Sequence, residues 1–117
     1  MASPDISRGE IWWVNWSPGR GSEQTGRRPA LVVQTNAANR NPRYPNTIVV
    51  ALSARGREVP FHVRLEPTTD NGLTEASFAK CEQILTVSKA RLEERLGRVA
   101  ADDLGRVASA LLLVLSI

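Results

Sequence analysis

Short apolar runs rich in valine, isoleucine and leucine alternate along this chain with segments of glycine, proline, asparagine and charged residues. β-branched and aromatic residues favour strands, and short runs bounded by turn residues are typical of a sheet rather than of long helices. The pattern predicts strands at residues 10–16, 29–35, 46–53, 61–65 and 76–87.

The segments between these runs have the composition of turns and loops. Residues 36–46 are rich in Asn, Pro and Arg, which predicts a loop, and residues 54–58 read as a basic hairpin turn. Residues 66–71 form another turn, and residues 88–90 favour a short helical turn. In the first strand the alternation is imperfect, and we expect Ile11, Trp13 and Val14 to point inward.

Residues 102–117 have the clearest helical pattern in the chain, with two acids in the first turn, where the helix dipole favours them. Leu112, Leu113 and Val114 widen the apolar face beyond one stripe. This helix is therefore covered on two sides, or it contributes to a subunit or partner interface. The residues at helical spacing are Leu104, Val107, Ala108, Leu111 and Leu115.

The fold class that follows is mainly β with a C-terminal helix (α+β), built as a small, strongly bent sheet or barrel. Residues 92–99 are ambiguous, because their Arg-Leu-Glu-Glu-Arg-Leu run favours a helix although a strand is compatible. With 117 residues and 42% hydrophobic content, residues 1–117 are expected to form one domain with a modest core.

The composition also limits the chemistry. No apolar run is long enough to cross a bilayer, and the only cysteine, Cys81, suits a reducing cytoplasm, where we expect it to be a small buried hydrophobe. One His and one Cys cannot supply a zinc site within one chain. We therefore expect no metal, no cofactor and no membrane association.

The net charge of +3 is unevenly distributed along the chain. Residues 20–64 hold eight arginines against two acids, a local balance of +6, whereas the rest of the chain is acidic. Such asymmetry favours a surface for a polyanion, although scattered, solvated arginines would give the same count.

The segment Arg-Gly-Ser-Glu-Gln-Thr-Gly-Arg-Arg-Pro at residues 20–29 runs directly into an apolar strand. Its glycines and small polar residues predict a loop attached to a rigid strand, which is a common location for binding and catalysis. The arginine guanidinium has a planar fork of donors that suits phosphate. The alternative is a solvated turn with incidental charges.

The chain resembles the MazF/PemK toxins, which are sequence-selective endoribonucleases of toxin–antitoxin pairs. The resemblance implies an SH3-like barrel of the MazF/CcdB type, a strand at residues 92–99, a homodimer and an acidic antitoxin. It extends over nearly the whole chain and rests on Arg8-Gly9-Glu10-Ile11-Trp12, Gly21-Ser22-Glu23-Gln24 with Gly26, Arg28-Pro29, Thr47-Ile48-Val49-Val50-Ala51, Pro60-Phe61-His62-Val63 and Glu82-Gln83-Ile84.

A ribonuclease without metal can use the 2′-hydroxyl of its substrate as the nucleophile, giving a 2′,3′-cyclic phosphate and a 5′-hydroxyl. The reaction needs a base, an acid and a cation for the charge that develops on the phosphate. His62 is the only histidine, so a two-histidine mechanism within one chain is impossible, and we expect His62 to face solvent or to pair locally.

Three residues are candidates for catalysis. Arg28 matches the essential arginine of the family, and we expect transition-state stabilisation rather than proton donation, because a guanidinium releases its proton reluctantly. Ser53 stands where the family has a threonine whose hydroxyl binds the scissile phosphate. Glu23 matches a glutamate that is either a base or an RNA contact in relatives, and the arginines around it would lower its pKa and weaken it as a base.

Further residues are candidates for RNA binding. Gln83 offers an amide donor and acceptor to a base edge, and Trp16 could stack on an unpaired base. We expect single-stranded RNA, because an RNA duplex hides its base edges. The remaining candidates are Arg20, Ser22, Gln24 and Arg27.

Two other classes of protein are compatible with parts of the sequence. One is a CcdB-like gyrase-poisoning toxin that acts by binding, although those toxins carry a C-terminal tryptophan and this chain ends Leu115-Ser116-Ile117. The other is an SH3-type adaptor for proline-rich peptides, which would need more exposed aromatic residues than this sequence offers.

Overall fold

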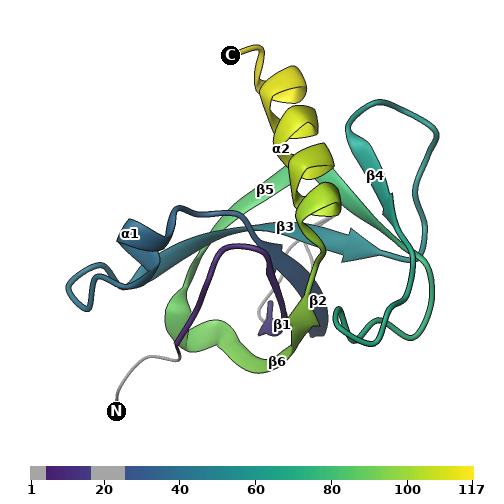
Figure 1. The fold of residues 1–117 in the computed structure, drawn as a ribbon. Coiled ribbons are helices and arrows are strands. Elements are labelled where there is room, and N and C mark those ends of the chain that lie inside the picture. The colour runs from purple at the N-terminus through teal and green to yellow at the C-terminus, as the bar shows by residue number, and fades with distance from the viewer. Residues whose placement is uncertain (1–4, 17–25) are drawn as a thin grey trace.

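The computed structural model describes residues 5–16 and 26–117, and within them six strands form one antiparallel sheet (Figure 1). The strand order is β4-β5-β3-β2-β1-β6, so β4 and β6 are the edges of a curved sheet that is not closed by hydrogen bonds. The elements are β1 (Glu10–Asn15), β2 (Arg27–Val32), α1 (Asn36–Asn39), β3 (Asn46–Ser53), β4 (His62–Leu65), β5 (Ser77–Ser88), the 3-10 turn η1 (Lys89–Arg91), β6 (Leu92–Arg98) and α2 (Ala101–Leu115).

The predicted fold class is confirmed, because a strongly bent antiparallel sheet is closed off by one C-terminal helix. The five predicted strands correspond to β1 through β5, with shifts of one to three residues at most ends. The predicted loop at residues 36–46 contains the short helix α1. The buried Asn39 side chain holds this segment in place, since its Oδ1 accepts hydrogen bonds from Gln34 Nε2 at 2.9 Å and Thr47 Oγ1 at 2.7 Å.

Residues 92–98 of the ambiguous segment form strand β6. The strand that the family resemblance implied here is therefore confirmed, and the helix that the local pattern favoured is wrong. β6 pairs with β1 along its length and leaves the side chains of Glu93, Glu94 and Arg95 exposed. Arg95 Nη1 lies 2.8 Å from the buried Glu10 carboxylate of β1. Strand pairing and this cross-strand ion pair outweigh a local helical preference that is worth only fractions of a kcal/mol per residue.

The sheet has a hydrophobic core on each face. One core lies between the sheet and α2 and includes Ile11, Val50 and Val107, whereas the other includes Trp12, Val14 and Trp16. Ile11 and Val14 point inward as expected. The expectation for Trp13 is corrected, because strand alternation places Trp12, Val14 and Trp16 on one buried face and leaves Trp13 partly exposed.

Helix α2 lies across β4 and β5 (Figure 1) and buries only part of its apolar surface. Val107 and Ala110 are buried, whereas Leu112, Leu113 and Leu115 are each more than half exposed. Helix α2 thus has the broad apolar face predicted from the sequence, and in a single copy of the chain part of this face is exposed to solvent. No helix within the described residues has the length and apolar character needed to span a membrane.

Candidate active site

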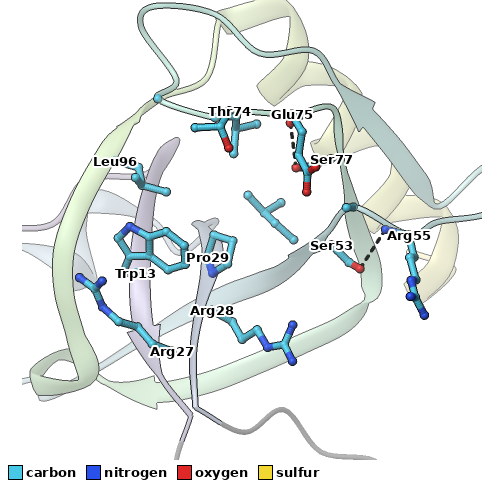
Figure 2. Close-up of a pocket in the computed structure, with 14 residues that line it drawn as sticks. Trp13, Arg27, Arg28, Pro29, Ser53, Arg55, Thr74, Glu75, Ser77 and Leu96 are labelled. Atoms are coloured by element: carbon cyan, nitrogen blue, oxygen red, sulfur yellow. Dashed lines mark hydrogen bonds between the residues drawn. The ribbon is translucent and has the colours of Figure 1, made fainter.

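A cavity of about 710 Å³ opens where the ends of several strands meet (Figure 2). Arginines and hydroxyls line one part of it, and apolar side chains line another, so it could accept both a phosphate and a base. The lining residues are Trp13, Arg27, Arg28, Pro29, Leu52, Ser53, Ala54, Arg55, Gly72, Leu73, Thr74, Glu75, Ser77 and Leu96.

The two arginines at the start of β2 have different surroundings. Arg27 forms ion pairs with the acids of β6: its Nε lies 3.3 Å from Glu93 and its Nη2 lies 2.6 Å from Glu94. Its guanidinium also lies over the Trp13 ring, 5.0 Å from the centroid. Arg27 is therefore largely neutralised and acts as a link between β2, β1 and β6.

Arg28 follows on the same strand, is exposed and extends into the cavity (Figure 2). Within the part of the chain that the structure describes, Arg28 has no ion-pair partner. An arginine without a carboxylate partner keeps its full charge and its donors for an incoming anion. Of the two arginines at the start of β2, Arg28 is thus the one whose guanidinium is available to a bound anion.

Ser53 ends β3 at the same cavity, which two paired strands, β2 and β3, bring to Arg28. Its Oγ accepts a hydrogen bond from the backbone N–H of Arg55 at 3.1 Å. That bond occupies an acceptor site of the hydroxyl and leaves its proton free for donation. The structure therefore brings together two of the three predicted catalytic side chains, Arg28 and Ser53.

The other predicted residues divide into three groups. Gln83 lies partly exposed on β5 and does not line the cavity. Trp16 is only 7% exposed and packs in the core, which corrects the expectation that its indole is available to stack, whereas Trp13 lines the cavity. The predicted residues Glu23, Arg20, Ser22 and Gln24 lie outside the described residues.

Glu75 is a carboxylate in this cavity that sequence reasoning missed. It lies in the connection between β4 and β5, exposed, and points into the opening that Arg28 and Ser53 line (Figure 2). It is the only carboxylate among the described lining residues. Glu75 lies 46 positions after Pro29 in the chain, so no local sequence signal indicated that it reaches the same site.

A tight turn before Glu75 fixes this rim of the cavity. The side chain of Asn71, which is 1% exposed, accepts hydrogen bonds from the backbone N–H groups of Thr68 and Leu73, both at 3.0 Å. Its Nδ2 donates to the Glu66 carbonyl at 2.8 Å. The following residue, Gly72, has φ +71 and lies against the backbone of Leu96, so both its conformation and the space around it favour glycine.

We expect Asn71→Ala to lower the free energy of unfolding by about 3 kcal/mol, because it leaves several buried backbone groups without partners. Chemical denaturation of the two proteins would measure this. Asn41→Ala is the matched control, because Asn41 makes one similar bond to the Arg43 N–H in an exposed loop. A loss below about 1 kcal/mol for Asn71→Ala would mean that the turn does not depend on its side chain.

The remaining reactive side chains do not form a second centre in the described residues. Burial, with a contribution from the nearby Glu82 charge, raises the pKa of Cys81 to about 11, so the thiol stays protonated at neutral pH. This agrees with the expected buried hydrophobe. His62 pairs locally, as expected, with Glu82. No group of three or more His, Cys, Asp or Glu side chains in residues 5–16 and 26–117 is placed to hold a metal ion.

Comparison with known proteins gives consistent matches over almost the whole chain. The model of the family described as PemK-like, MazF-like toxin of type II toxin–antitoxin system matches residues 7–115. The Endoribonuclease MazF9 of Mycobacterium tuberculosis is 40% identical over 116 residues, which cover 96% of this chain and 98% of that protein.

Two solved structures show the same arrangement of the chain. A crystal structure of MazF from Deinococcus radiodurans has a TM-score of 0.79 and 28% identity, with full coverage of both chains. An endoribonuclease from a mycobacterial species, solved in complex with its cognate antitoxin, has a TM-score of 0.78 and 26% identity over 96% of each chain.

Proposed function

Because the chain belongs to the PemK-like, MazF-like toxin family of type II toxin–antitoxin systems, we propose that it is a toxin that cleaves single-stranded RNA at selected sequences. The observation that carries this proposal is the cavity in which Arg28, with no ion-pair partner in the described chain, lies with the Ser53 hydroxyl. A cation and a hydroxyl donor that converge on open space suit a phosphodiester.

In the proposed reaction the 2′-hydroxyl of RNA attacks the adjacent phosphorus and the bond to the 5′-oxygen breaks. The leaving 5′-oxygen takes a proton from water, so the products are a 2′,3′-cyclic phosphate and a 5′-hydroxyl. Arg28 stabilises the charge that develops on the phosphate oxygens, and Ser53 donates a hydrogen bond to one of them. The reaction requires no metal, because the substrate itself supplies the nucleophile.

A carboxylate receives the proton of the 2′-hydroxyl in this scheme. Glu23 remains the residue suggested by the family resemblance, either as the base or as an RNA contact. Glu75 is a second candidate, since its side chain enters the cavity where the phosphate would bind. Comparing the pH dependence of kcat in Glu23→Gln and Glu75→Gln would assign the base, because only loss of the base removes its titration from the profile.

The apolar part of the cavity suits an unpaired base next to the cleaved bond. Trp13 offers a partly exposed indole there, and Pro29 and Leu96 line the same space. Aromatic stacking of a base contributes about 1–3 kcal/mol. In this proposal Arg20, Ser22 and Gln24 contact the RNA from the segment before β2, Arg27 contacts it at the edge of the cavity, and Gln83 binds a base outside the cavity.

Trp13→Ala should therefore raise KM about tenfold or more, with a smaller change in kcat, because it removes the stacking surface but not the groups around the phosphate. Trp13→Phe is the matched control and should retain most of the affinity, since it keeps an aromatic ring. Steady-state cleavage of a short fluorescent RNA would measure both variants. Equal KM values for Trp13→Ala and the parent would place the base elsewhere.

As a toxin, the protein would inhibit translation in the cytoplasm by cutting RNA and would be neutralised by a cognate acidic antitoxin. Two copies would pair as a homodimer, in which the exposed leucines of α2 become covered. An acidic antitoxin would be attracted to the excess of arginine in residues 20–64. The alternative of a gyrase-poisoning toxin is not favoured, because the relatives that match are described as endoribonucleases or MazF toxins.

Incubation of the purified protein with a long RNA tests the proposed function. Discrete fragments with cyclic phosphate ends, mapped on a total RNA pool, would support it and would give the recognised sequence. Arg28→Ala protein, purified in the same way, is the control for contaminating ribonucleases. RNA that stays intact at high protein concentration would rule out the enzyme.

A further inference from the structure

The imidazole of His62 lies between two hydrogen-bonding partners at the start of β4. Its Nδ1 is 3.0 Å from the backbone nitrogen of Arg57, and its Nε2 is 2.8 and 3.0 Å from the two carboxylate oxygens of Glu82 on β5. The His62 side chain is only 6% exposed. Both ring nitrogens therefore have hydrogen-bonding partners.

The two partners determine which tautomer the ring adopts. A backbone N–H can only donate, so Nδ1 must be the unprotonated acceptor, and the proton of the neutral ring must reside on Nε2. A carboxylate can only accept, and Glu82 therefore favours the proton at Nε2. Glu82 thus fixes the tautomer that allows His62 to hold the Arg57 backbone.

Arg57 belongs to residues 54–58, the arginine loop, which leads from β3 back to β4 at the edge of the cavity. Gly56 of this loop lies flat against the Phe78 ring, so closely that a Cβ at this position would overlap the ring. At the other end of the loop, the Arg55 N–H binds Ser53 Oγ, and Arg55 lines the cavity (Figure 2). Three contacts thereby hold the arginine loop in place: hydrogen bonds to Ser53 and His62, and packing against Phe78.

We propose that His62 is a positioning residue for the active site. Through the Arg57 backbone it holds the arginine loop against the sheet, so that Arg55 and the Ser53 hydroxyl are presented to the phosphate. Glu82 supports this role by fixing the tautomer of the ring. The inference rests on the proposed ribonuclease function, because it assigns the loop to that site.

Two substitutions of similar size separate the two bonds of the ring. In His62→Asn the side-chain oxygen can occupy the place of Nδ1 and keep the bond to Arg57, but the contact with Glu82 is lost. In His62→Gln the amide nitrogen can reach the place of Nε2 and keep the contact with Glu82, but the loop loses its acceptor. The two variants therefore test whether activity depends on the bond to Arg57 or on the contact with Glu82.

We expect His62→Gln to lower kcat about tenfold or more with little change in KM, because a small displacement of a positioned group is costly. His62→Asn should retain most of the rate. Glu66→Gln is a control for a surface substitution next to β4 that leaves His62 and Glu82 unchanged, since Glu66 forms an exposed ion pair with Arg64. If His62 only stabilised the fold through Glu82, His62→Asn would be the more damaged variant, and that order would overturn the proposal.

Amide hydrogen exchange at Arg57 gives a readout that does not need RNA. The Arg57 N–H should be protected in the parent and in His62→Asn, and it should exchange at least tenfold faster in His62→Gln. Equal exchange in all three proteins would show that His62 does not hold the loop. A parent protein that cleaves no RNA but shows the expected exchange pattern would overturn the enzymatic role and leave the loop contact intact, so the two failures are distinguishable.

Discussion

An RNA with a single 2′-deoxynucleotide on the 5′ side of the scissile phosphate should bind to this protein and remain uncut. The substitution removes one oxygen, which is the nucleophile in the proposed reaction, while the phosphate that Arg28 would contact is unchanged. The thiol of Cys81 does not supply an alternative nucleophile, since it is buried in the core and its pKa is raised to about 11. This is the largest effect that we expect from any single change.

The measurement is cleavage of two otherwise identical short RNAs in the presence of EDTA. The all-ribose RNA should be cut at its usual rate, because in the proposed reaction the substrate supplies the nucleophile and Arg28 stabilises the developing charge. The deoxy RNA should act as a competitive inhibitor. Activity that EDTA abolishes and magnesium restores, or cleavage of the deoxy RNA, would contradict the mechanism.

Arg28→Ala should lower the cleavage rate by roughly two to three orders of magnitude, the scale observed when a donor to a developing oxyanion is removed. Arg28→Lys should restore only part of the rate, because an ammonium lacks the planar fork. Thermal stability should change little, since Arg28 is exposed and has no ion-pair partner in the described part of the chain. Single-turnover kinetics would measure the chemical step directly.

Arg27→Ala is the matched control for Arg28→Ala. The Arg27 charge is already paired with Glu93 and Glu94, so its loss should affect the chemical step much less, within about tenfold. Ser53→Ala should be milder than Arg28→Ala, and Ser53→Thr should be tolerated because it keeps the hydroxyl. A rate for Arg28→Ala within about fivefold of the parent would mean that Arg28 only positions the RNA.

The candidate site shows which of its residues could be predicted from the sequence and which could not. Arg28 and Ser53 were chosen chiefly through the family resemblance, and paired strands bring these two side chains to one cavity. Trp13 was expected to point inward and Trp16 to be available at the surface, but strand alternation buries Trp16 and leaves Trp13 partly exposed. Glu75 was missed because it enters the cavity from a distant turn that depends on Asn71.

The sequence by itself determined the order and type of most elements, because apolar periodicity and turn residues act over a few neighbours. It also determined the helical pattern of residues 102–117 and the excess of arginine in residues 20–64. Only the tertiary structure decided that residues 92–98 are a strand, since pairing with β1 outweighs their helical preference. Only the tertiary structure paired Arg27 with Glu94 and His62 with Glu82, because these contacts join segments that are far apart in the chain.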